Sequence, residues 1–567
     1  MDIQYSLPDD LKRGLQDAQA DWKSNGKLAL LWAKDASLWT GEDEGKWLGW
    51  LDIVERQQAD IDTLTALRDD VKAAGFEYAL LLGMGGSSLC PEVLSLTYGK
   101  QAGYPALHIV DSTDPAQVSA AEKAVDLTKT VCIVASKSGS TLEPNILKDY
   151  FFEQMKKAVG ADKAGSHFIA ITDPGSKMEQ VAKADGFRAI YYGDPAIGGR
   201  FSALSKFGMV PAAVAGLDLT RFLQSAADGV AAAKTSDVEK NSAAILGLIL
   251  GTAHNAGRDK LTFFTSPEIF DLGAWLEQLI AESTGKIGRG ITPVDRETIG
   301  SPAVYGNDRV FAYVRLKGGD NAALDAGVAE LEKAGQLVVR FEINDVYDLP
   351  AQFFTWEFAV AVAGSVMGIN PFNQPDVEAA KVATRALTDA YAKTGKLAEQ
   401  TPLVETSGIK VFADAKYAAT LGKQADVAGY IKAHLEQIKA HDYFATLAYI
   451  QNDRAHESAI QAFRMKVRDA KKVATCLGFG PRFLHSTGQD YKGGPNTGVF
   501  LQITAAHAAD VAIPGAKYTF GVVIDAQAAG DLTVLEERGR RALRVHLGKD
   551  VEAGLKTLAG WVSSALK

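Results

Sequence analysis

The sequence predicts an α/β protein with two tandem, doubly wound, mostly parallel domains and a C-terminal mixed α/β region. Short apolar runs alternate with amphipathic stretches along most of the chain. Such alternation is typical of parallel sheets with helices on both faces. A chain of 567 residues with 47% hydrophobic content also exceeds what one core usually holds, so several packed domains are expected.

Residues 1–45 are predicted to form an N-terminal helical segment in which Trp22, Trp32 and Trp39 fill a core interface. The segment begins with acidic and polar residues rather than a basic stretch before an apolar run, so no signal peptide is expected. The apolar stretch at 243–253 is too short to span a bilayer. A soluble protein with no membrane partner is therefore predicted.

The expected strands divide the remaining chain into three parts. Residues 46–235 contain FEYALLLG, ALHIVDS, TVCIVASKS, HFIAITD and RAIYYGD, which suit a first domain. Residues 236–400 contain DKLTFFTS, RVFAYVRL and QLVVRFEI, which suit a second. Residues 401–567 mix strands such as GIKVFAD and TGVFLQIT with helices such as HESAIQAFRMKVRDAKK.

Composition excludes several classes of function. The formal net charge of -9 argues against nonspecific nucleic-acid binding. The three cysteines show no CxxC spacing, so neither a disulfide framework nor a zinc site is expected, and a reducing cytoplasm fits. No metal-ligand cluster is visible, and neither a metal nor a cofactor is predicted.

A first glycine-rich loop, LLLGMGGSSLCPEV at 81–94, follows an apolar strand and precedes a helix. Glycines there let backbone N–H groups approach a ligand, so Gly86 and Ser87 are candidate binding residues. The loop lacks the full GxGxxG spacing, which argues against a dinucleotide site. A tight turn with no ligand is the alternative interpretation.

A second loop, IVASKSGSTLEPN at 133–145, is rich in hydroxyl groups and also follows a strand. Hydroxyls and backbone donors at a helix start can hold a phosphate, whereas simple N-capping explains only one or two of these residues. SKSGST resembles the phosphate loop of sugar isomerase (SIS) domains. The candidate phosphate-binding residues are Ser136, Lys137, Ser138, Ser140 and Thr141.

Two further segments carry charged groups suited to proton transfer. In LEQLIAESTGKIGRGITPV, Gln278 lies one helical turn before Glu282, so the two side chains share a face. In DPAIGGRFSALS, two glycines precede Arg200, whose permanent cation can face a developing oxyanion. Taken singly, each would more often be a solvated or paired surface charge. Both segments resemble the active-site motifs of the phosphoglucose isomerase family.

The segment MGINPFNQPDVEAAK at 367–381 resembles that family's NPF(D/N)QPGVEAYK motif. The resemblance implies that Gln374 lies on the phosphate side and that Lys381 contacts the ring oxygen of the substrate. The chain departs from the motif at Asp376, usually glycine, and at Ala380, usually tyrosine. These departures leave Lys381 in register.

The histidine that helps open the sugar ring in most of the family lies between the glutamate and lysine motifs, but here no histidine occurs between Glu282 and Lys381. His485 in GPRFLHSTGQDYKGGPNTGVF is the best candidate, because small and polar residues surround it. This segment resembles the isomerase half of fused transaldolase–isomerase proteins. A structural histidine bonded to the loop backbone is the alternative.

Five motifs in the family's order imply an aldose–ketose isomerase that interconverts glucose 6-phosphate and fructose 6-phosphate in glycolysis and gluconeogenesis. By this resemblance, Lys381 with a histidine opens the ring. Glu282 moves a proton between C2 and C1 through a cis-enediolate, which Arg200 steadies. The alternatives are a noncatalytic sugar-phosphate-binding SIS protein and the isomerase part of a bifunctional enzyme. The family is commonly dimeric, so a homodimer is possible.

Overall fold

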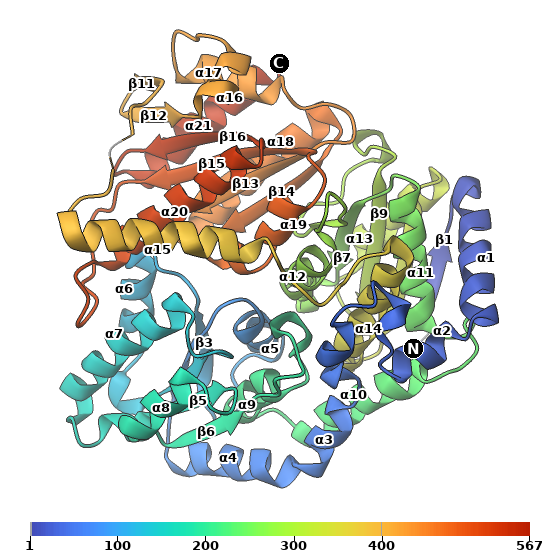
Figure 1. The fold of residues 1–567 in the computed structure, drawn as a ribbon, viewed down its shortest axis with the longest axis horizontal. Coiled ribbons are helices and arrows are strands. Elements are labelled where there is room, and N and C mark those ends of the chain that lie inside the picture. Colours follow the sequence, from blue (N-terminus) through green and yellow to red (C-terminus); the bar gives the residue numbers. More distant parts are fainter. Residues whose placement is uncertain (1–2, 399) are drawn as a thin grey trace.

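The computed structural model describes residues 3–398 and 400–567, so residues 1, 2 and 399 of the expected N-terminal and second segments lie outside it. The described chain contains three β-sheets, each flanked by helices, as Figure 1 shows. The predicted α/β class with mostly parallel sheets is confirmed. No helix of the described residues is long and apolar enough to cross a bilayer.

The first sheet is entirely parallel and has the order β3-β2-β4-β5-β6. Alternate residues of β2 pack into different cores, Leu81 with one face and Leu80 with the other. Helices therefore cover both faces, as in a doubly wound unit. The strands are β2 (Tyr78–Leu82), β3 (Ala106–Val110), β4 (Thr130–Ala135), β5 (Phe168–Thr172) and β6 (Ala189–Tyr192). The helices are α4 (Ile61–Ala73), α5 (Leu89–Tyr98), α6 (Pro115–Lys123), α7 (Leu142–Val159), α8 (Lys177–Ala184) and α9 (Lys206–Val214).

The second sheet has the order β1-β10-β9-β7-β8, and only β1 runs antiparallel to its neighbour. The N-terminal segment is thus not purely helical, because its first described residues add an edge strand to this sheet. The strands are β1 (Ile3–Ser6), β7 (Lys260–Thr265), β8 (Thr292–Val294), β9 (Arg309–Leu316) and β10 (Leu337–Ile343). The helices are α1 (Asp9–Ser24), α2 (Lys27–Trp32), α3 (Ile53–Ala59), α10 (Leu219–Ala233), α11 (Ser242–Asn255), α12 (Leu272–Thr284), α13 (Ala322–Lys333) and α14 (Leu349–Met367).

The third sheet has the order β11-β12-β16-β15-β13-β14. Its last four strands are parallel to one another, whereas β12 runs antiparallel to both of its neighbours, β11 and β16. The strands are β11 (Val404–Thr406), β12 (Ile409–Phe412), β13 (Tyr443–Tyr449), β14 (Ala474–Phe479), β15 (Gly498–Ala505) and β16 (Arg541–Leu547). The helices are α15 (Val377–Thr394), α16 (Ala415–Leu421), α17 (Val427–Leu435), α18 (Arg454–Lys471), α19 (Gly488–Gly493), α20 (Phe520–Glu537) and α21 (Val551–Ala565).

The third sheet's unit packs against the other two rather than standing apart. In Figure 1 the long helix α15 runs along the boundary between this unit and the helices of the first sheet. Phe520 and Val523 of α20 belong to the same apolar core as residues of β2 and β4. The short helix α19 lies beside α12 of the second sheet's unit. The segments before α19 and around α20 are therefore held close to both other units.

Candidate active site

The carboxyl end of α12 carries the predicted amide and carboxylate, both buried. The Gln278 Nε2 donates hydrogen bonds to Glu282 Oε2 at 3.0 Å and to the carbonyl oxygen of His485 at 2.9 Å. The Gln278 Oε1 is buried and has no partner among the described residues. The amide therefore fixes the carboxylate and leaves one acceptor for a ligand hydroxyl.

Arg200 lies in a 3-10 turn, and its side chain is only 1% exposed. Four hydrogen bonds to other segments hold the guanidinium group. Its Nε donates to Ser283 Oγ at 2.7 Å, and its Nη1 donates to Gln374 Oε1 at 3.0 Å. Its Nη2 donates to the carbonyl oxygens of Pro371 at 2.6 Å and Asn373 at 3.0 Å. The structure thus joins the GGRFS, AESTGK and NPFNQP segments through one guanidinium group.

The fifth N–H group of Arg200 remains for another acceptor, because a guanidinium carries five. The Arg200 Nη1 lies 3.8 Å from Glu282 Oε2, which is an ion pair but too long for a direct hydrogen bond. Burial lowers the pKa of the guanidinium, and the nearby Glu282 opposes that shift. The group stays cationic beside the carboxylate.

The first glycine loop packs against these residues. A Cβ atom on Gly86 would lie 1.9 Å from the carbonyl oxygen of Gly199, directly before Arg200. A Cβ atom on Gly85 would lie 2.8 Å from the carbonyl oxygen of His485. Gly86 and the half-buried Ser87 do not line the cavity beside His485 that is described below. The loop therefore sets the position of Arg200 and His485 by close backbone packing.

His485 lies in a short 3-10 turn, and its ring faces a buried carboxylate that the sequence motifs did not single out. The His485 Nε2 lies 3.1 Å from Glu143 Oε1. The Gln527 Nε2 donates to the same oxygen at 2.6 Å, and Thr113 Oγ1 donates to Gln527 Oε1 at 2.6 Å. Burial raises the pKa of the Glu143 carboxyl, but His485 and Lys381 outweigh it and lower that pKa overall. With Nε2 as the donor to Glu143, the ring keeps Nδ1 as an acceptor.

A cavity of about 820 Å³ opens beside His485. The hydroxyl-rich loop at the start of α7 forms one wall, where Ser138 Oγ and Ser140 Oγ lie 2.9 Å apart. Helix α15 forms the facing wall through Lys381, whose side chain is 41% exposed and lies 3.6 Å from Glu378. Thr141, His485 and Glu143 also line the cavity. Hydroxyls, a helix start and a cation together suit an anionic ligand.

Two predicted phosphate-loop residues turn away from this cavity. The Lys137 Nζ is paired with Asp173 Oδ2 at 2.5 Å, and neither residue lines the cavity. The Ser136 Oγ is buried and has no partner among the described residues. The structure thus brings the cavity-lining hydroxyls to Lys381 and His485, but not Ser136 and Lys137.

Arg200, Gln278, Glu282 and Gln374 form a second group that does not line the same cavity. The bond from Gln278 to the His485 backbone connects the two groups. Among the described residues, no three histidine, cysteine, aspartate or glutamate side chains are arranged to hold a metal ion.

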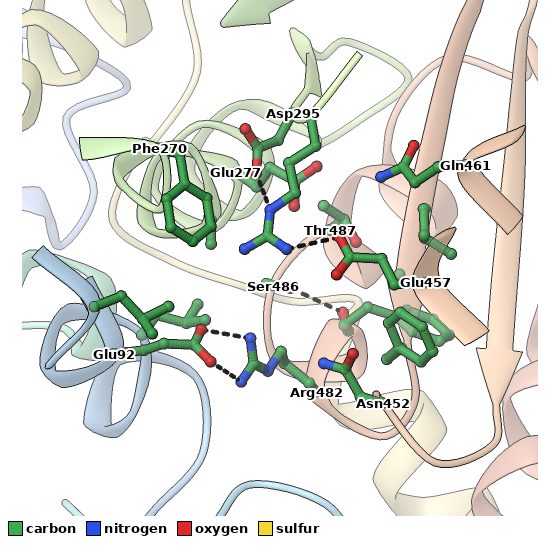
Figure 2. Close-up of a pocket in the computed structure, with 18 of the residues that line it drawn as sticks. Glu92, Phe270, Glu277, Asp295, Asn452, Glu457, Gln461, Arg482, Ser486 and Thr487 are labelled. Atoms are coloured by element: carbon green, nitrogen blue, oxygen red, sulfur yellow. Dashed lines mark hydrogen bonds and ion pairs between the residues drawn. The ribbon is translucent and has the colours of Figure 1, made fainter. Parts of the chain in front are cut away.

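A smaller cavity of about 400 Å³ lies behind the His485 turn, where the three units meet (Figure 2). Arg482 of the turn is paired with Glu92 of α5 at 2.5 Å and with Asp111 after β3 at 2.8 Å. Ser486 and Thr487, which directly follow His485, line this cavity. The arginine pairs with the first sheet's unit and so fixes the turn that carries His485.

One family model matches part of the chain. Residues 73–309 match the family model described as phosphoglucose isomerase. The chain is 27% identical over 379 residues to the glucose-6-phosphate isomerase of Mycoplasmopsis pulmonis, covering 59% of this chain and 88% of that protein. It is 31% identical over 292 residues to the glucose-6-phosphate isomerase of Leuconostoc mesenteroides, covering 45% of this chain and 65% of that protein.

Solved structures resemble part of the chain. A hypothetical protein from Thermus thermophilus matches with a TM-score of 0.58 and 26% identity, covering 68% of this chain and 99% of that one. A glucose-6-phosphate isomerase from Chlamydia trachomatis matches with a TM-score of 0.55 and 18% identity, covering 68% and 87%. The matched range 73–309 contains Arg200, Gln278 and Glu282 but not Lys381 or His485.

Proposed function

We propose, because residues 73–309 belong to the phosphoglucose isomerase family, that this chain is a glucose-6-phosphate isomerase. The family membership makes it an aldose–ketose isomerase acting on a small sugar phosphate. The observation that carries the finer proposal is the buried group in which Gln278 orients Glu282 beside Arg200, which keeps one N–H group for a ligand.

Ring opening is the first step of the proposed reaction. The neutral imidazole of His485 accepts the proton of the anomeric hydroxyl at Nδ1, because its Nε2–H donates to Glu143. Lys381, on the facing wall of the cavity, donates a proton to the ring oxygen as its bond to C1 breaks, so this oxygen leaves as a hydroxyl group. The proton held by His485 then returns to Lys381 through solvent. Glu143 stabilises the imidazolium that forms.

Proton transfer follows on the open chain. Glu282 removes the proton from C2 and returns it to C1 through a cis-enediolate. The remaining N–H of Arg200, 3.8 Å from the carboxylate, faces the negative charge that develops on the enediolate oxygens. The unpartnered Gln278 Oε1 accepts from a substrate hydroxyl. One carboxylate serves both carbons, while the proton of the C2 hydroxyl passes to the oxygen on C1, so that C1 becomes an alcohol and C2 a ketone.

Phosphate binding supplies orientation away from the reacting carbons. The hydroxyls of Ser138, Ser140 and Thr141 and the amino end of α7 hold the phosphate in the cavity. Gln374 acts indirectly by accepting a bond from Arg200. Ser136 and Lys137 support the loop rather than contact the substrate, because Lys137 is paired with Asp173.

A coupled assay on fructose 6-phosphate tests this proposal with Glu282→Gln. We expect kcat to fall by at least about 10³-fold while phosphate binding is kept, because the amide has the same shape but cannot accept a proton. Glu330→Gln, at an exposed position of α13, is the matched control and should keep full activity. Wild-type turnover by Glu282→Gln would contradict the assigned base, and an inactive wild-type chain would favour a noncatalytic sugar-phosphate-binding protein.

A further inference from the structure

The third sheet has a topological switch point that the proposed active site does not use. The strand that follows β13 in the chain, β14, lies on one side of it, and β15 lies on the other. In open α/β sheets, ligands bind outside the carboxyl ends of the two strands where the order reverses. The region beyond Tyr449 and Ala505, which end β13 and β15, is therefore where this unit should bind a ligand.

A cavity of about 780 Å³ occupies this position, which we call the β13–β15 crevice. Its walls come from the residues that follow β13, β15 and β16, and helix α6 of the first sheet's unit closes the opposite side. This volume lies in the range of small-molecule sites. None of the candidate active-site residues lines it. Its lining combines alanines on both walls with histidines, lysines and carboxylates.

The walls of the crevice are mostly small and apolar. The run from Ala505 to Ala509 is interrupted only by His507, and α6 contributes Ala116 and Ala120. The backbone N–H groups of residues 506–509 donate to no acceptor among the described residues. Small side chains leave these donors open to close approach, as in other loops that bind phosphate.

The polar side chains in the crevice include a buried imidazole with one free nitrogen. His456 is 8% exposed, and its Nδ1 lies 2.9 Å from the carbonyl oxygen of Gln451. Its Nε2 has no partner in the described structure, although the residue lines the cavity. Because this nitrogen is open to the crevice and has no protein partner, it can bond a ligand or water group there.

The crevice contains both cationic and acidic side chains, and its two lysines are not paired with the acidic ones. Lys123 and Lys549 form no ion pair with a described residue. The Nε2 of His507 is bonded to Asp525 Oδ1 at 3.2 Å, and Asp525 raises the pKa of the imidazole despite its partial burial. Two of the acidic lining residues cap helices, since Asp114 accepts from Gln117 N and Asp550 from Ala553 N. Glu552 is the remaining acidic group.

We propose that the β13–β15 crevice binds a mononucleotide-sized organic phosphate at a site separate from the isomerase centre. The N–H groups of residues 506–509, His507 and Lys549 hold the phosphate, and the alanines of both walls pack against the ring. The free Nε2 of His456 bonds a polar group of the ligand. Because α6 belongs to one unit and the other walls to another, the ligand ties together the two units that supply Glu143 and His485.

Titration calorimetry of the full chain with adenosine monophosphate at low salt tests the proposal, with inorganic phosphate as the second probe. We expect binding of adenosine monophosphate to be at least tenfold tighter than that of inorganic phosphate, because only the nucleotide reaches the apolar walls. The double variant His507→Ala/Lys549→Ala should weaken it at least tenfold. Lys556→Ala, an exposed lysine of α21 outside the crevice, is the matched control and should bind like the wild type.

A second variant fills the volume of the crevice and leaves its charged side chains in place. Ala116→Trp, at an exposed position of α6, should fill the crevice without disturbing the third sheet and should abolish binding. Saturating glucose 6-phosphate should leave nucleotide binding unchanged, since the two sites share no lining residue. Undetectable binding of the nucleotide at millimolar concentration would overturn the proposal. So would displacement by glucose 6-phosphate, or equal binding by wild type, the double variant and Ala116→Trp.

Discussion

The group proposed to open the sugar ring depends on a partner that lies far away in the sequence. His485 and Glu143 are 342 residues apart and come from two different units. Glu143 is in turn held by Gln527, a third distant position. The hydroxyl-rich motif pointed to the loop just before Glu143. It gave no sign that the second residue of the following helix would turn toward a histidine, because that contact exists only once the third unit is docked.

Glu143→Gln should impair ring opening more than proton transfer. The amide cannot stabilise an imidazolium at His485, so we expect kcat on cyclic glucose 6-phosphate to fall by roughly 10- to 100-fold. Turnover of an open-chain analogue that cannot cyclise should change by less than about threefold. Stopped-flow and steady-state assays on both substrates measure this split.

His485→Ala provides the matched comparison, and we expect it to show the same split. The double variant should be no slower than the slower single variant, because the two residues act as one unit. Equal losses on cyclic and open-chain substrates would remove the pair from ring opening. The histidine would then be structural, which was the alternative interpretation of its motif.

Arg200 shows how much residue spacing can predict about a single side chain. The motif predicted a cation that faces a developing oxyanion, and in the structure Arg200 lies 3.8 Å from the Glu282 carboxylate. Four of the five N–H groups of the side chain bind protein acceptors, which residue spacing could not predict. These acceptors lie in two other segments of the chain. The same cation thus orders the site before any substrate arrives.

Among the elements, the two glycine-containing turns depend on each other. The turn at Gly86 and the turn at Gly199 touch through their backbones, and a single Cβ atom would separate them. The sequence interpretation assigned Gly86 to ligand approach, since a strand followed by a glycine-rich turn is typical of that role. Whether a turn packs against a ligand or against another turn is decided by tertiary contacts that a single sequence does not contain.

Gly86→Ala should therefore damage the site through a neighbouring element. The new Cβ would lie 1.9 Å from a backbone oxygen of Gly199, so the turn before Arg200 must shift. We expect kcat/KM to fall at least about tenfold and the free energy of unfolding to fall by roughly 1 to 3 kcal/mol. Steady-state kinetics and chemical denaturation measure the two effects.

Gly198→Ala is the control for this substitution, because it lies next to Gly199, the residue that Gly86 contacts. A Cβ atom there meets nothing within 4 Å, and its φ of -66° suits any residue. We expect near wild-type kinetics and stability. If both variants lose activity equally, flexibility of the loop rather than the close packing of Gly86 explains the glycine requirement.

At the scale of the whole molecule, much of the fold could be predicted from local patterns. The apolar runs in residues 78–192 correspond to all five strands of the first sheet, of which the central strands β2, β4 and β5 are almost wholly buried. Strand β1 was missed, since four partly exposed residues at a sheet edge leave no apolar pattern. The docking of the third unit, which brings His485 to the site, could not be predicted, because it depends on shape and on pairs such as Arg482 with Glu92.

The junction of the three units contains a carboxyl group that should make stability depend on pH. Glu277 lines the junction cavity shown in Figure 2, near Asp295. Burial and the negative charge of Asp295 raise its pKa to about 8, although Arg464 and Arg296 oppose the shift. In the unfolded chain the group should have an ordinary pKa near 4.5. The folded state thus binds the proton more tightly, so its contribution is fully present below pH 4.5 and is lost as pH rises toward 8.

Glu277→Gln should remove this loss, because the amide stays neutral at every pH. We expect a nearly unchanged melting temperature at pH 5 and an increase of about 2 to 4 °C at pH 8, equivalent to a gain on the order of 3 kcal/mol. Scanning calorimetry from pH 5 to pH 8 measures the difference, with the exposed Glu330→Gln as a control that should shift at neither pH. A lower melting temperature of Glu277→Gln at pH 8 would mean that Glu277 is ionised and stabilises the junction by pairing with Arg296 or Arg464. The three units would then be joined by charge pairs that strengthen, rather than weaken, as the pH rises.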